Sequence, residues 1–198
     1  MENFSIIYDE KTFDEVKSDI VFVFNVSKNF SEKIIESAKN FGALVVCVTS
    51  NKIEKNNFDS VVLTPDVKLF IERISNLIEN PYEINLDFIN IKRFFQNAGN
   101  ISVGFGKSEG ELITATEDAI SSFEQKNIFD NAKEILMIFS TSEKNFSFAE
   151  VNTASIIVQE NFSENANIIF GVVNDEKLGD FVEVLILVGE GGNIYESD

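Results

Sequence analysis

The chain has 198 residues, of which 44% are hydrophobic, and its 33 acidic and 16 basic side chains give a formal charge of −17. At this length a chain buries about 70% of its unfolded surface, which is enough for one large domain or two small ones without a disulfide or a metal. The negative charge repels nucleic-acid phosphates and anionic lipid headgroups, so neither is expected as a direct partner. The absence of His and the single Cys exclude His-based catalysis and the common zinc sites, and we expect no metal or cofactor.

In the first third of the chain, apolar runs of strand length alternate with helical patterns, which predicts a layered α/β protein. A short helix is expected at Asp14–Lys17, and a longer one begins near Ser31, a suitable N-cap, and ends at Gly42. Cys47 lies inside an apolar run and is expected to be an inert core thiol. The predicted strands are Ile6–Tyr8, Ile20–Phe24, Ala43–Thr49 and Ser60–Thr64.

After Pro65, an apolar stripe from Val67 to Ile78 predicts a helix that Asn80-Pro81 terminates. We expect a domain boundary there, with residues 1–82 in a first unit and residues 83–198 in a second. Within the second unit, the span from about Asp87 to Gly191 contains a full alternation of helices and strands, so we expect it to fold alone. Its predicted helices are Phe88–Asn97, Leu112–Phe123 and Ala149–Glu160, and its predicted strands are Ile101–Phe105, Glu134–Ser140, Asn167–Val173 and Phe181–Val188.

The glycine-containing segment Gly104–Gly110 follows a predicted strand and precedes a helix, as a phosphate-binding turn does. Its spacing fits neither G-x-G-x-x-G nor the Walker motif. Glu109 and Glu111 would also place two negative charges beside a phosphate. We therefore expect a structural surface turn.

The segment Asn85-Leu86-Asp87-Phe88-Ile89-Asn90-Ile91-Lys92 resembles the activating loop of FtsZ, the tubulin homologue of cell division, which reads close to Asn-x-Asp-Phe-x-Asp-Val-Lys. The resemblance covers roughly residues 19–191, and the strands near the C-terminus resemble the last two strands of the FtsZ core. It implies an α/β fold with a reduced Rossmann-like N-terminal layer, followed by an FtsZ-type C-terminal α/β domain with a mixed sheet. In FtsZ, one subunit inserts this loop into the nucleotide site of the next subunit. The implied interaction residues are Asn85, Asp87, Asn90 and Lys92.

The resemblance to FtsZ fails at the phosphate-binding loop. Where FtsZ carries Gly-Gly-Gly-Thr-Gly-Thr-Gly, this chain has Phe24–Phe30, which contains two Phe and no glycine. Backbone amides can surround a phosphate only where glycines permit positive φ and leave no side chain in the way. Segment 1–18 has no counterpart of the first part of the GTPase domain, and the long central helix is reduced to residues 68–78. We therefore expect a remnant of the GTPase-type domain that binds no GTP and is not an enzyme.

Asp87 has two compatible interpretations. As an N-cap before an apolar-periodic helix it would contribute about 1 kcal/mol. As a docking residue it would correspond to one of the two FtsZ acids that polarise the attacking water, while Asn90 replaces the other. Because an amide is a poor general base, the loop is expected to dock better than it catalyses.

The most concrete function implied is that of a non-GTPase FtsZ-like protein that binds or caps FtsZ or another tubulin-like filament through this loop. The alternatives are a nucleotide-independent homo-oligomeric scaffold and, with less support, an enzyme acting on a small metabolite. No signal peptide or membrane span is recognisable, so we expect a cytoplasmic protein. The sequence ends at Asp198 without the C-terminal peptide of FtsZ, and no direct membrane contact is expected.

Overall fold

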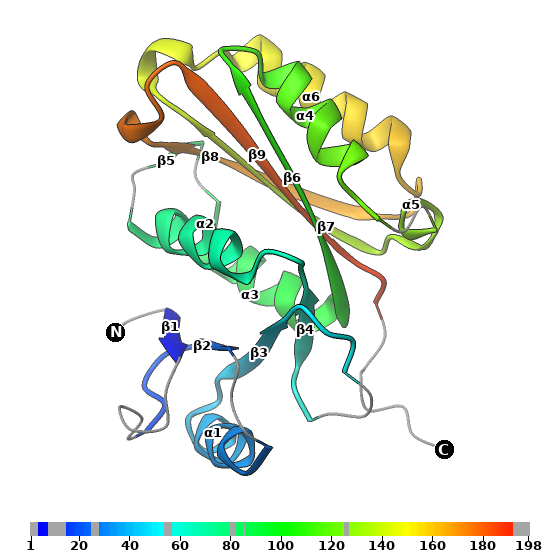
Figure 1. The fold of residues 1–198 in the computed structure, drawn as a ribbon. Coiled ribbons are helices and arrows are strands. Elements are labelled where there is room, and N and C mark those ends of the chain that lie inside the picture. Colours follow the sequence, from blue (N-terminus) through cyan, green and yellow to red (C-terminus); the bar gives the residue numbers. More distant parts are fainter. Residues whose placement is uncertain are drawn as a thin grey trace.

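The computed structural model describes residues 4–7, 15–24, 28–53, 57–79, 82–84, 86–124 and 127–191. In these ranges, one continuous sheet of nine strands runs in the order β1-β2-β3-β4-β6-β9-β7-β8-β5 (Figure 1). The strands are β1 (Phe4–Ile7), β2 (Ile20–Phe24), β3 (Leu44–Thr49), β4 (Ser60–Leu63), β5 (Tyr82–Ile84), β6 (Asn100–Glu109), β7 (Glu134–Thr141), β8 (Asn167–Asn174) and β9 (Phe181–Gly189). The helices are α1 (Lys28–Phe41), α2 (Val67–Glu79), α3 (Phe88–Asn97), α4 (Leu112–Ser121), α5 (Ile128–Asn131) and α6 (Phe148–Asn161), with two 3₁₀ turns, η1 (Glu143–Asn145) and η2 (Glu176–Leu178).

The strand directions divide the sheet into two parts. Strands β1 to β4 and β6 are parallel. Strand β9 is antiparallel to both of its neighbours, β6 and β7, whereas β7 and β8 are parallel and β5 is antiparallel to β8. The predicted α/β class, with a Rossmann-like N-terminal layer and a mixed C-terminal sheet, is confirmed.

Helices cover both faces of this sheet and define three apolar layers (Figure 1). Helix α1 packs on one face of β2 to β4, and α4 and α6 pack on one face of the C-terminal strands. Helices α2 and α3 lie between the two parts and share one buried cluster with strands from both. In that cluster the Phe22 ring lies 6.2 Å from Phe70 on α2 and 5.2 Å from Phe95 on α3.

The shared cluster crosses the boundary predicted between residues 82 and 83. Phe22 and Phe70 precede that boundary, whereas Phe95 and Leu187 follow it. The two-unit division remains a prediction, and the cluster indicates that the units would stabilise each other through apolar burial.

An ion cluster around the buried Glu183, formed with Arg73 and the exposed Lys107, joins α2 to the C-terminal sheet. Glu183 on β9 is 2% exposed, and its carboxylate accepts a hydrogen bond from Arg73 Nη2 at 2.9 Å. Lys107 Nζ on β6 lies 3.0 Å from the same carboxylate. A second contact, from Asn76 Nδ2 to Asp175 Oδ2 at 3.2 Å, ties α2 to the segment after β8.

The expected surface turn at Gly104–Gly110 is wrong, because β6 continues to Glu109. A Cβ at Gly104 would lie 2.4 Å from the Phe123 ring, and one at Gly106 would lie 1.9 Å from Ala115 O. These glycines therefore allow α4 to pack closely on the strand. The chain turns at Gly110, where φ is +69°.

Two other expectations need correction in the N-terminal half. Glu15–Lys17 are not helical, and Asp14 lies outside the described residues. Helix α1 begins at Lys28, three residues before the expected cap Ser31. A strong apolar stripe locates a helix but leaves its first turn poorly defined. No helix in the described ranges is long and apolar enough to cross a membrane.

Candidate interaction site

The start of α3 carries the residues that the loop resemblance selects. Asp87 has extended backbone angles, and its Oδ1 accepts a hydrogen bond from Ile89 N at 3.0 Å. The Asp87 carbonyl accepts from Asn90 N at 2.9 Å and from Ile91 N at 3.2 Å. Asp87 is therefore the N-cap of α3, and its charge is favourable beside the free amides of the first turn.

Apolar side chains on either side of the cap fix the direction in which the turn projects. Leu86 precedes Asp87, Ile91 follows it in the first turn, and both belong to the buried cluster between α2, α3 and the sheet. This arrangement is a hydrophobic staple. The Phe88 ring packs edge-to-face on Phe4 of β1, with ring centroids 5.2 Å apart. The turn is thus anchored on two sides.

The outward side of the turn is accessible. Asp87 is exposed and Asn90 is half-buried, while Ile89 is 62% exposed. Ile89 was not among the predicted interaction residues, although its place between Asp87 and Asn90 could have suggested it. The turn therefore presents a carboxylate and an aliphatic side chain close together.

Lys92 has a partner inside the chain. Its Nζ lies 2.9 Å from Asp19 Oδ1, and both side chains are 30% exposed. This ion pair joins α3 to the residue that precedes β2. Asn85, the remaining predicted interaction residue, lies outside the described residues. The role of all four in binding a partner remains a prediction.

The connection from β2 to α1 is the segment that the resemblance aligns with the FtsZ phosphate-binding loop. Strand β2 ends at Phe24 and α1 begins at Lys28, and the intervening residues, Asn25-Val26-Ser27, lie outside the described part. No glycine occurs in this connection. Because glycines are what let backbone amides surround a phosphate, this sequence favours the prediction that the connection binds no phosphate.

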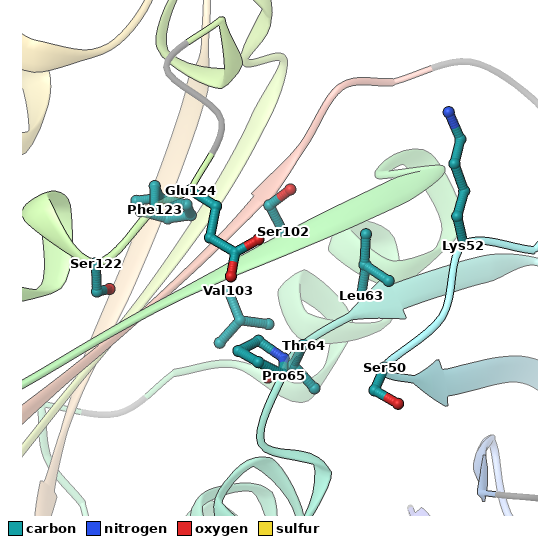
Figure 2. A pocket seen from close by; sticks show the side chains of 10 residues that line it. All are labelled: Ser50, Lys52, Leu63, Thr64, Pro65, Ser102, Val103, Ser122, Phe123 and Glu124. Carbon is teal, nitrogen blue, oxygen red and sulfur yellow. The ribbon is translucent and has the colours of Figure 1, made fainter.

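A cavity of about 200 Å³ lies at the carboxyl ends of β3 and β4, where they face β6 and the end of α4 (Figure 2). Its lining residues are Ser50, Lys52, Leu63, Thr64, Pro65, Ser102, Val103, Ser122, Phe123 and Glu124. The carboxyl ends of parallel strands are common ligand sites in α/β proteins.

The polar groups of this cavity do not form a recognisable catalytic set. Lys52 and Glu124 are its charged lining residues, and in Figure 2 the Lys52 side chain extends away from the others. The Ser122 hydroxyl donates to Ala119 O at 2.7 Å and accepts from Phe105 N at 2.9 Å. These hydrogen bonds stabilise the end of α4 and engage the hydroxyl as both donor and acceptor.

Two titratable groups in the N-terminal half are perturbed by burial. Desolvation raises the pKa of the Cys47 thiol to about 12, as expected for an unreactive core cysteine. Desolvation also raises the pKa of Asp59, although the hydrogen bond from Val45 N, 2.7 Å long, and the charge of Lys39 oppose the change. Both groups lie at β3, Cys47 on the strand itself and Asp59 bonded to Val45 N.

This arrangement defines an α/β protein in which a parallel layer and a mixed sheet share two central helices. Residues 98–191 match the C-terminal domain of the FtsZ family. In structure, the chain is similar to a mutant FtsZ of M. jannaschii, with 21% identity over 89% of this chain and 66% of that chain and a TM-score of 0.67. An empty FtsZ dimer of M. jannaschii gives 22% identity, 87% and 63% coverage, and a TM-score of 0.69. The CetZ of Methanosaeta thermophila strain DSM 6194 gives 14% identity, 92% and 63% coverage, and a TM-score of 0.66.

The resemblance to FtsZ is therefore confirmed in sequence for residues 98–191 and in fold for most of the chain. The solved structures, at 14–22% identity, show that the chain has the fold of FtsZ and CetZ. The chain spans 66% and 63% of the length of the two FtsZ structures.

Proposed function

We propose that this protein is an FtsZ-like chain without GTPase activity that binds the nucleotide-bearing face of an FtsZ or tubulin-like filament subunit through the start of α3. The observation that carries the proposal is the anchored but accessible turn, in which Asp87 and Ile89 are exposed on a helix whose other side is packed into the core. A contact surface held by rigid elements loses little conformational entropy when a partner binds.

The resemblance to the FtsZ loop supports the choice of partner. In that family the loop enters the nucleotide site of the neighbouring subunit, and one related structure is described as an FtsZ dimer. Asp87 would supply one acidic group to the neighbour, whereas Asn90 would supply a neutral amide. Because an amide is a poor base, the contact would hold the neighbour without accelerating its hydrolysis of GTP.

The capping role depends on the other end of the molecule. A filament subunit normally offers its own nucleotide site to the next subunit. Here the glycine-free stretch between Phe24 and Phe30 supports the absence of such a site. The bound chain would accept no further subunit and would end the filament on one side.

Calorimetric titration tests the absence of the nucleotide site. We expect no saturable binding of GTP or GDP at micromolar concentrations. A saturable site for either nucleotide would contradict the proposed cap.

Co-pelleting with assembled FtsZ from the same organism tests the contact. We expect the parent protein to pellet with the filaments and Asp87→Ser to remain in the supernatant, because Ser preserves the helix cap and removes the charge. As a matched control, Asp180→Ser removes an exposed carboxylate near η2 and should pellet like the parent. Equal pelleting of both variants would show that the turn is not the contact.

A further inference from the structure

The outer face of α6 combines exposed apolar side chains with a lack of exposed charge before Glu160. Helix α6 lies on the outside of the C-terminal sheet (Figure 1), and it buries Val151, Ala154 and Val158. On the opposite side, Phe148 is 69% exposed and Ile156 is 44% exposed. Single exposed apolar residues are common, but these two lie on one stripe of one helix.

The rest of that face is uncharged up to the last turn. Glu150 is half-buried, and its carboxylate turns toward α4, where it accepts a hydrogen bond from Leu112 N at 3.4 Å. The first fully exposed charge is Glu160. The exposed residues before it are Phe148, Ala149, Asn152, Thr153, Ile156 and Gln159.

Helix α1 provides the contrast within the same molecule. Its exposed residues include Glu32, Lys33, Glu36 and Lys39, as is usual for a solvated helix face. On a chain with a formal charge of −17, two copies repel each other wherever acids face acids. Up to Glu160, the outer face of α6 is a surface where two copies can meet without opposing acids of this helix and without desolvating one of its charges.

The stripe is also self-complementary. Phe148, Asn152 and Ile156 follow one another at intervals of four residues, so they lie about 6 Å apart along one side of the helix. If a second copy packs antiparallel with its Asn152 opposite this Asn152, each Phe148 meets the Ile156 of the other copy. The two amides then face each other, and each carries both a donor and an acceptor for the other.

We propose that α6 is the contact of a twofold-symmetric homodimer, with Asn152 at the symmetry axis. Such an interface uses the same patch on both copies, as closed dimers do. A helix of 14 residues is only about 21 Å long, so the contact buries less than the roughly 800 Å² per partner of a typical stable complex. The dimer is therefore weak and depends on protein concentration.

This inference is independent of the proposed filament contact. Helix α6 belongs to the apolar layer of α4 and the outer face of the sheet, whereas α3 belongs to the layer between the two parts of the molecule. Pairing through α6 leaves the start of α3 free on both copies. A dimer would thus carry two filament-binding turns.

Sedimentation velocity over increasing concentrations of the full chain tests the proposal. The parent protein is expected to shift from the mass of one chain toward twice that mass, and Phe148→Asp and Ile156→Asp are each expected to weaken dimerisation about tenfold or more. Phe41→Asp, at an exposed apolar residue of α1, is the matched control and should dimerise like the parent. A parent protein that stays monomeric throughout, or a dimer that resists both α6 substitutions, would overturn the proposal.

Oxidative crosslinking tests the position of the axis. Asn152→Cys places two thiols opposite each other and is expected to give a covalent dimer under mild oxidation, because a disulfide requires Cα atoms within about 7 Å. Lys39→Cys on α1 is the exposed control, and the native Cys47 is buried. Equal crosslinking of the two variants would overturn the symmetric arrangement.

Discussion

Asp87 caps a helix and, in the proposed contact, would also bind the partner. Its carboxylate caps α3 through Ile89 N while remaining exposed to a partner. Substitutions that differ only in capping ability separate the two roles. Ser caps nearly as well as Asp, whereas Ala does not.

We expect Asp87→Ala to lower the free energy of unfolding by about 1 kcal/mol and Asp87→Ser to change it by much less. Denaturant unfolding of the parent and both variants measures this difference. Equal stability of Asp87→Ala and the parent would mean that the observed hydrogen bond contributes nothing.

Asp59 offers a test of burial in the N-terminal layer. Desolvation raises its pKa in the folded state above the ordinary value of 3.8, so the folded chain holds this proton more tightly than the unfolded chain. Its contribution to stability therefore falls as the pH rises from about 3.8 through the raised pKa, and then stays constant. Asn can still accept the hydrogen bond from Val45 N without carrying the charge.

We expect the stability of Asp59→Asn relative to the parent to increase over that pH window. Thermal unfolding of both proteins at a series of pH values measures the change. A relative stability that falls as the pH rises would contradict the assigned cause.

At the scale of elements, the ion cluster of Arg73, Glu183 and Lys107 holds α2 against the C-terminal sheet. Removing one member of a buried ion pair leaves its partner uncompensated, and this costs about 3–5 kcal/mol. We expect Glu183→Ala to lower the free energy of unfolding by about 3 kcal/mol, since Lys107 is partly exposed and can be resolvated. The exposed ion pair between Lys144 and Asp180 is the control, and Asp180→Ala should cost less than about 1 kcal/mol.

Denaturant unfolding compares the two variants. A cost for Glu183→Ala no larger than that for Asp180→Ala would show that the cluster does not clamp α2. Unchanged m-values would indicate that both variants unfold from the same compact state.

The elements that the sequence predicted well are those with uninterrupted apolar patterns. Strand β9 was found because it is buried on both faces, as its continuous apolar run indicated. Strand β5 was missed because three residues, Tyr82–Ile84, are too short for a periodic pattern. The last part of β6 was read as a turn because glycine marks turns and close packing alike.

Of the candidate site, only the features set by neighbouring residues in the sequence could be predicted. The capping role of Asp87 follows from its position before an apolar-periodic helix, and local residues determine it. The pairing of Lys92 with Asp19 joins residues 73 apart in the sequence, and no local pattern specifies that contact. The outward direction of Ile89 likewise depends on how Leu86 and Phe88 pack.

At the scale of the whole molecule, the predicted division into residues 1–82 and 83–198 can be tested by truncation. The second part should keep its outer layer, formed by α4, α6 and the C-terminal strands. It would lose the burial that α2 and β2 provide for α3. We expect residues 83–198 to unfold cooperatively but with lower stability than the full chain, as measured by circular dichroism. Absence of a cooperative transition would contradict the boundary.

The central claim is that the chain ends FtsZ-type filaments through the start of α3. Electron microscopy of FtsZ filaments assembled with GTP, with this protein added at substoichiometric amounts, measures it most directly. We expect shorter filaments with the parent protein and normal lengths with Asp87→Ser, which keeps the cap and loses the charge. Filaments of unchanged length with the parent protein, or equal shortening by Asp87→Ser, would contradict the claim.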